Sequence, residues 1–272
     1  MDGILIVNKP KGLTSRDVVN ILNKKFHTKK IGHTGTLDPM ATGVLVCLIG
    51  KYTKLSNVIT SDKKEYEASF DLGYLTDTLD NEGIKTKTNN KECSEEEIKR
   101  AVDSFKKTYM QEVPKYSAVK INGKRLYEYA RNNEDINLPK REVTIYDIEY
   151  LGNNSFKCLV SKGTYIRSLI RDIGSTLNTY ATMTSLKRTK QGTFDIKDSY
   201  TLEDIENDKY KLIKAEDIFN TIELNKEEAI KASNGVKLKL DAKDDIVCLK
   251  YNNEIICLYK KDKDYYKMLL KF

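Results

Sequence analysis

The chain has 272 residues, of which 39% are hydrophobic and 32% charged, so it can form one large domain or a large and a small one. The sequence contains no run of about 18 apolar residues, the length that a membrane-spanning helix would need. The N-terminus lacks an export signal, and the five scattered cysteines contain no C-x-x-C pair, so we expect a cytoplasmic protein. The formal net charge of +7 suits a polyanionic partner without establishing one.

The first half of the chain predicts strands and helices in mixed order. Residues 4–7 are predicted as a strand, and Ser15 is predicted to cap a helix with one apolar face. Apolar runs predict further strands at 44–49 and 66–72. Ser94 begins a capping-box pattern, which predicts a helix after it.

The second half continues this mixed order. Alternating apolar residues predict strands at 143–151 and 156–160, and helical spacing follows Gly163. Thr201 is predicted to begin another short helix. Because strands and helices do not alternate regularly, we predict a mixed α+β fold rather than a doubly wound sheet.

The character of the sequence changes near residue 220. Asn225 is predicted to cap a short helix, and strand-like runs follow at 245–249 and 255–259. We therefore predict a large domain over residues 1–220 and a small, β-rich domain over residues 221–272.

The stretch 32–43, GHTGTLDPMATG, places one Asp, one His and three Gly between two apolar runs. Pro39 favours an extended backbone at Asp38, so the carboxylate is predicted to lie on a stiff loop. A phosphate-binding loop is excluded, because Gly50-Lys51 is followed by Tyr52. A metal site is not predicted, because the chain has only two histidines. A structural turn with a capping Asp would have the same composition.

Several blocks, in order from residue 3 to about residue 192, resemble the motifs of the TruB family of pseudouridine synthases. The blocks are residues 3–15, 32–43, 64–67, 76–80, 116–120, 126–131, 162–172 and 186–188. Bacterial members of this family modify uridine 55 in the T arm of tRNA. The resemblance implies a pseudouridine synthase fold with a bent mixed sheet. Residues 221–272 resemble a short form of the RNA-binding PUA domain.

The resemblance also implies the chemistry. Uracil is detached from its ribose, turned and rejoined through ring carbon 5, which needs no cofactor and no metal. The catalytic residue is then Asp38. It could attack the sugar, attack the base or assist proton removal, and the sequence does not choose among these roles.

The other site residues follow from the matching motifs. Arg167 is expected to pair with Asp38, which favours the charged carboxylate and fixes its direction. Asp80 is expected to hold Arg167 from the other side. Tyr66 is expected to stack on the everted uracil, with its hydroxyl available for proton transfer, and Leu186 to seal the opposite face of the pocket.

Three more residues and the RNA contacts complete the prediction. His33 is expected to occupy or line the space left by the everted base, while Lys9 and Pro10 support Tyr66 from behind. Residues 112–141 carry seven basic against four acidic residues among tyrosines, which suits an insertion that closes on RNA. The predicted RNA contacts are Lys11, Lys64, Lys120, Lys124, Arg125, Arg131 and Arg141.

The favoured hypothesis is a monomeric tRNA uridine-55 isomerase that acts on the T-arm stem-loop without an obligate protein partner or a membrane. One alternative is a guide-RNA-dependent subunit of the dyskerin type; the ending of the 32–43 stretch and the 112–141 insertion favour the stand-alone enzyme. A second alternative is a tRNA-binding folding helper. The presence of Asp38, Tyr66 and Arg167 favours catalysis over binding alone.

Overall fold

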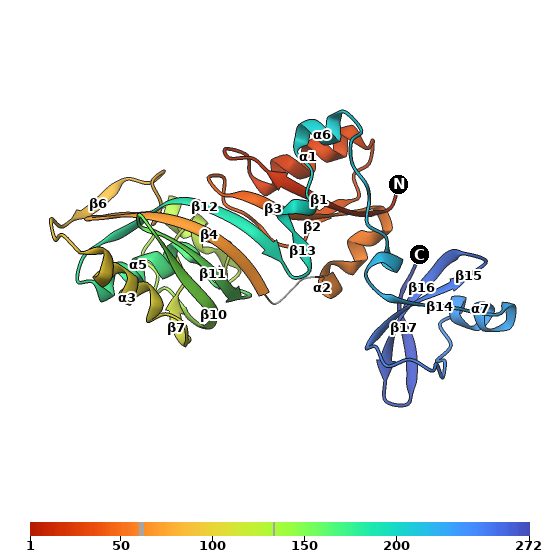
Figure 1. Ribbon diagram of the computed structural model, residues 1–272. Helices are drawn as coiled ribbons and strands as arrows, with labels where there is room; N and C mark the ends of the chain where they lie inside the picture. The colour runs from red at the N-terminus through yellow and green to blue at the C-terminus, as the bar shows by residue number, and fades with distance from the viewer. Residues whose placement is uncertain (60–62, 133) are drawn as a thin grey trace.

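The computed structural model describes residues 1–59, 63–132 and 134–272 (Figure 1). Within these residues, nine strands form one bent, mixed sheet in the order β1-β3-β12-β4-β11-β10-β7, with β2 beside β3 and β13 beside β12. The strands are β1 (Gly3–Lys9), β2 (Ile31–His33), β3 (Thr42–Ile49), β4 (Lys63–Leu72), β7 (Thr108–Glu112), β10 (Lys140–Gly152), β11 (Ser155–Ser161), β12 (Ala181–Gln191) and β13 (Phe194–Asp195). The predicted α+β class is confirmed.

A narrow junction joins the two halves of this sheet. The parallel pairing of β3 with β12 comprises two residue pairs, Lys187 with Thr42 and Arg188 with Gly43. Gly43 has a φ of +98°, and a Cβ atom there would lie 2.2 Å from the carbonyl oxygen of Arg188. Only glycine fits this close approach of the two backbones.

Helices cover one face of each half (Figure 1). Helix α1 (Ser15–Lys25) packs on the β1–β3 half, and α3 (Glu95–Asp103) and α5 (Ile166–Thr176) pack on the other half. The apolar stripes of these helices and the inward-facing strand residues form one continuous core. None of the described helices is both long and apolar enough to cross a membrane.

A second, four-stranded sheet contains the C-terminal residues, in the order β14 (Asn220–Glu223), β15 (Ile246–Tyr251), β16 (Glu254–Asp262) and β17 (Tyr265–Lys271). Helix α7 (Lys226–Ser233) follows the predicted Asn225 cap and packs on this sheet. Cys248 and Leu258 join a core cluster with Ile4 and Val46. The C-terminal sheet therefore packs on the face of β1 and β3 that α1 leaves uncovered.

The remaining elements are short. They are η1 (Gly50–Leu55), α2 (Ser56–Ile59), β5 (Tyr74–Thr76), β6 (Lys85–Thr88), β8 (Lys120–Ile121), β9 (Lys124–Arg125), α4 (Leu126–Arg131), η2 (Ile196–Asp198), α6 (Leu202–Glu206) and η3 (Ala215–Asp217). The predicted helix caps at Ser94, Thr201 and Asn225 are confirmed.

The prediction that Ser15 caps the first helix is wrong. Thr14 is the cap, and its side chain exchanges hydrogen bonds with Asp17 in a capping box. Ser15 is buried, and its hydroxyl accepts the backbone N–H of Leu37 at 2.8 Å. A tertiary contact to the loop of residues 34–41 therefore occupies the side chain that the local pattern assigned to the cap.

Candidate active site

The loop that carries Asp38 is fixed on both sides of that residue. Before Asp38, Leu37 is held by Ser15, as described above. After Asp38, Pro39 is held by the ammonium group of Lys9. Its Nζ donates to the carbonyl oxygens of Leu13 at 2.6 Å, Pro10 at 2.9 Å and Pro39 at 3.2 Å. Asp38 thus lies between two anchored neighbours, which gives its carboxylate a defined position.

Arg188 ties the same loop to β12. This side chain is fully buried, and its Nε donates to the carbonyl oxygen of Val44 at 2.7 Å and its Nη2 to that of Gly35 at 2.9 Å. Burial raises the pKa of the neighbouring Tyr66 hydroxyl, while the charge and hydrogen bond of Arg188 oppose that rise. Arg188 therefore links β12 to β3 and to the loop that carries Asp38.

Asp38 forms an ion pair with Arg167 at the start of α5. The distance from Arg167 Nε to Asp38 Oδ2 is 3.0 Å, and that to Asp80 Oδ2 is 3.9 Å. The Arg167 Nη1 and Nη2 atoms donate to the carbonyl oxygens of Thr78 at 2.8 Å and Tyr116 at 3.1 Å. The Arg167 side chain is 6% exposed and that of Asp38 36% exposed. The carboxylate is thus paired on one side and open on the other.

Asp80 is itself held in place. It accepts a hydrogen bond from Thr78 Oγ1 at 2.6 Å and one from the backbone N–H of Glu82 at 3.2 Å. Between Thr78 and Asp80, Leu79 has a φ of +65°, a strained conformation for a branched residue. The strained turn allows the carbonyl of Thr78 and the carboxylate of Asp80 to face the same guanidinium.

The open side of Asp38 faces a cavity of about 320 Å³, within the size range of small-ligand pockets. Its walls are residues 34–38, 117–118 and 161–167, with Lys64, Tyr66, Leu186 and Arg188. Four predicted site residues, Asp38, Tyr66, Arg167 and Leu186, therefore line one cavity. Asp80 lies behind Arg167.

The structure does not bring every predicted residue into this cavity. Among the described residues, His33, Lys9 and Pro10 are not in its walls. His33 is half-buried on β2, its Nδ1 has no hydrogen-bond partner, and burial lowers its pKa, helped by Arg16 and Arg188. Lys9 holds the Asp38 loop, so its predicted role behind Tyr66, with Pro10, stays a prediction, as does the role of His33.

Lys9 gives the fold a pH dependence. Burial lowers the pKa of Lys9 to about 8, although the negative charge of Asp38 acts to raise it. In the unfolded chain the pKa of a lysine is about 10.4. Between these values the unfolded state binds more protons, so this group favours the folded state increasingly as pH rises. The free energy of unfolding of the unsubstituted protein minus that of Lys9→Met should therefore grow from pH 8 to pH 10 in urea titrations. A difference that stays constant over this range would contradict the assignment.

In the 112–141 insertion, basic side chains lie over aromatic rings. Residue 133 lies outside the described residues. The guanidinium carbons of Arg125 and Arg131 lie 5.8 and 5.4 Å from the centre of the Tyr127 ring, and Lys124 lies 4.5 Å from the Tyr129 ring centre. The basic and aromatic residues that the sequence places in this insertion therefore contact one another.

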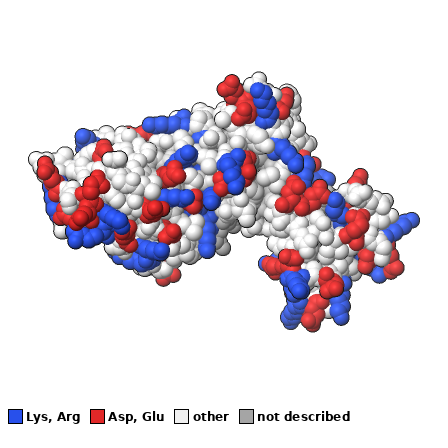
Figure 2. Space-filling view, in the orientation of Figure 1, with Lys and Arg blue, Asp and Glu red and all other residues white. Residues whose placement is uncertain are grey.

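The remaining predicted RNA contacts are dispersed. Lys64 lines the cavity beside Asp38, while Lys120 and Arg141 are exposed on β8 and β10. Figure 2 shows Lys and Arg interspersed with Asp and Glu over the face in view, not gathered in one basic patch.

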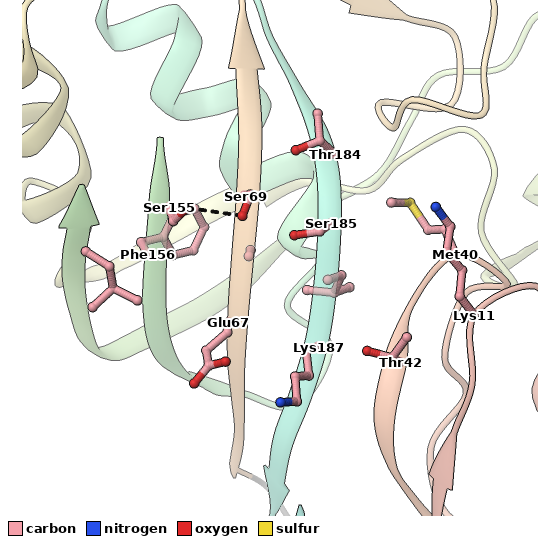
Figure 3. A pocket seen from close by; sticks show the side chains of 13 residues that line it. Lys11, Met40, Thr42, Glu67, Ser69, Ser155, Phe156, Thr184, Ser185 and Lys187 are labelled. Carbon is pink, nitrogen blue, oxygen red and sulfur yellow. Dashed lines mark hydrogen bonds between the residues drawn. The ribbon is translucent and has the colours of Figure 1, made fainter. Parts of the chain in front are cut away.

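A second groove, of about 430 Å³, lies on β4, β11 and β12 (Figure 3). Glu67 and Lys187 point into it, and they alternate along their strands with Tyr66 and Arg188. Leu186 lines both this groove and the cavity beside Asp38, so the two hollows meet at β12. Lys11, another predicted RNA contact, forms part of its rim. Within the described part of the chain, no cluster of three or more His, Cys, Asp or Glu could hold a metal ion.

Sequence reasoning missed several groups in the site. The carbonyl oxygens of Thr78 and Tyr116 hold Arg167, and backbone acceptors leave no signal in residue types. The resemblance includes residues 186–188 but implies no role for Arg188. Its complete burial is the structural observation that identifies that role.

Comparisons with known proteins give consistent results. The model described as "TruB family pseudouridylate synthase (N terminal domain)" matches residues 23–166, and "tRNA pseudouridylate synthase B C-terminal domain" matches residues 167–226. The chain is 44% identical to tRNA pseudouridine synthase B of Clostridium tetani, over 97% of this chain and 93% of that protein. It is 42% identical to tRNA pseudouridine synthase B of Caldicellulosiruptor saccharolyticus, over 100% and 98%. In fold it resembles a chain of a Cbf5-Nop10-Gar1 complex, with a TM-score of 0.71, 23% identity and coverage of 99% and 85%.

Proposed function

Because the chain belongs to the TruB family of pseudouridylate synthases, we propose that it isomerises uridine to pseudouridine in tRNA, at position 55 of the T-loop. The observation that carries this proposal is the 3.0 Å ion pair between Asp38 and Arg167 at the wall of a cavity that also contains Tyr66 and Leu186. A carboxylate held by a buried guanidinium and open on its other side suits reaction with one face of an everted nucleoside.

The residue roles are part of the proposal. Asp38 acts on the ribose or the base, and Arg167 keeps its carboxylate charged and directed. The ring of Tyr66 stacks on the uracil and Leu186 covers the other face. Each step uses groups of this chain, and the ring leaves and rejoins the same ribose, so no oxidant or reductant is consumed.

We further propose that residues 1–220 form the catalytic domain and residues 221–272 an RNA-binding domain. Within the first, the 112–141 insertion closes on the T arm, which is supported by its cation–ring pairs and by Ser117 and Ala118 in the cavity wall. The protein acts alone as a monomer. The similarity to a chain of a multiprotein complex concerns the fold alone and does not assign a protein partner to this chain.

One assay tests the activity. Purified protein is incubated with an unmodified T-arm stem-loop, without guide RNA, added protein or metal, and pseudouridine is mapped along the RNA. We expect one modified uridine, at position 55. A stem-loop that stays unmodified until a guide RNA is added would favour the guide-dependent alternative, and binding without modification under either condition would favour the folding helper.

A further inference from the structure

The position of Arg167 depends on where α5 begins. Arg167 is the second residue of this helix, and Tyr165 before it makes no side-chain cap. Helix N-termini leave backbone N–H groups without intrahelical partners. Here a residue of β7 supplies one acceptor: Gln111 Oε1 accepts the N–H of Tyr165 at 2.8 Å. A strand 54 residues earlier therefore holds the first turn of the helix that carries Arg167.

Gln111 is also fixed at its other end. Its Nε2 donates to Tyr109 Oη at 2.8 Å, and Tyr109 Oη donates to Asp172 Oδ2 at 3.2 Å. Asp172 is paired with Arg171 at 2.8 Å in the second turn of α5. The backbone N–H of Tyr165 can bond only to the oxygen of the amide, so this contact sets its orientation, and the Tyr109 hydroxyl satisfies the other end.

The same strand also leads to a second support of Arg167. Tyr116, whose carbonyl oxygen accepts from Arg167 Nη2, follows β7 by four residues. Ser168 of α5 donates to the carbonyl oxygen of Glu112 at 2.8 Å. The guanidinium is therefore placed by a helix start and by a segment that are both anchored on β7.

Gln111 is 1% exposed and lies outside the walls of the catalytic cavity that the structure describes. We propose that Gln111 is a positioning residue for the isomerisation: it fixes the start of α5 so that Arg167 meets Asp38, without touching the RNA. This inference rests on the function proposed above. A buried amide that bonds a backbone N–H would otherwise be replaceable by an apolar side chain of equal volume with an effect on stability alone.

The test compares Gln111→Met with a matched control in single-turnover assays on the T-arm stem-loop, with RNA affinity and thermal unfolding measured in parallel. Gln111→Met keeps the volume and removes both hydrogen bonds. We expect its rate constant to fall about 10- to 100-fold, with RNA affinity within about threefold of the unsubstituted protein. Tyr109→Phe is the matched control, because it breaks the distal link and keeps the Gln111–Tyr165 bond; its rate should stay within about threefold.

A double substitution separates positioning from a general structural effect. If Gln111 acts through Arg167, adding Gln111→Met to Arg167→Lys should lower the rate by less than about threefold further. Independent, multiplying losses would overturn the inference, as would a folded Gln111→Met protein with an unchanged rate.

Gln111→Glu gives a second route if Gln111→Met does not unfold cooperatively. Its carboxyl oxygen still accepts from Tyr165, so its rate should stay within about fivefold of the unsubstituted protein. A folded Gln111→Glu protein that binds RNA normally but loses more than that would overturn the inference. An unsubstituted protein that forms no pseudouridine would instead contradict the proposed function.

Discussion

Replacing Asp38 by Asn is expected to lower the single-turnover rate of pseudouridine formation by on the order of 10⁴-fold. Asn has the same shape, and the hydrogen bonds that fix the loop involve Leu37 and Pro39, not the Asp38 side chain. The substitution therefore removes one negative charge and one nucleophile or base from an otherwise intact cavity. RNA affinity should change by less than about threefold, because phosphate contacts dominate binding.

The control for this experiment is Asp198→Asn, which changes an exposed carboxylate far along the chain. It should leave rate and affinity unchanged, and both variants should unfold at the temperature of the unsubstituted protein within a few degrees. Pseudouridine formation at a near-normal rate by Asp38→Asn would show that the catalytic group lies elsewhere.

The second large effect is expected at Arg167. Its guanidinium meets two carboxylates and two carbonyl oxygens at once, and the single ammonium of Arg167→Lys cannot reproduce that planar arrangement. We expect a rate loss of about 100-fold from a misdirected Asp38. Arg167→Met should lose more, and should also unfold at a lower temperature, because Asp38 and Asp80 would then face each other without a cation.

Arg100→Lys on α3 is the matched control, since it makes the same exchange at an exposed position. Single-turnover rates and thermal unfolding of the three variants distinguish the roles. If Arg167→Lys isomerises uridine as fast as the unsubstituted protein, the geometry of the guanidinium is not required for the reaction.

Much of the fold was predictable because its central strands are continuous or alternating apolar runs. Residues 44–49 and 66–72 both became strands of the main sheet. The middle strand β12 was missed as an element. Its buried residues include Thr182, Arg188 and Gln191, whose polar side chains are typical of exposed positions and form hydrogen bonds to residues far along the chain.

In the candidate site, too, local motifs were predictable and contacts between distant residues were not. Short motifs identified Asp38, Tyr66, Arg167 and Leu186, which the structure places around one cavity. The choice of Thr14 over Ser15 as a helix cap could not be predicted, because it depends on a loop 22 residues away. The support of Arg167 by backbone carbonyls was also invisible, because a carbonyl belongs to every residue type.

The narrow junction between β3 and β12 has a consequence for how the reaction is organised. Asp38 comes from the segment before β3, whereas Tyr66, Arg167 and Leu186 all come from the far side of that junction. Neither half of the sheet by itself carries all four of these side chains. For the proposed reaction, the required side chains are therefore assembled only where the backbones of β3 and β12 meet at Gly43.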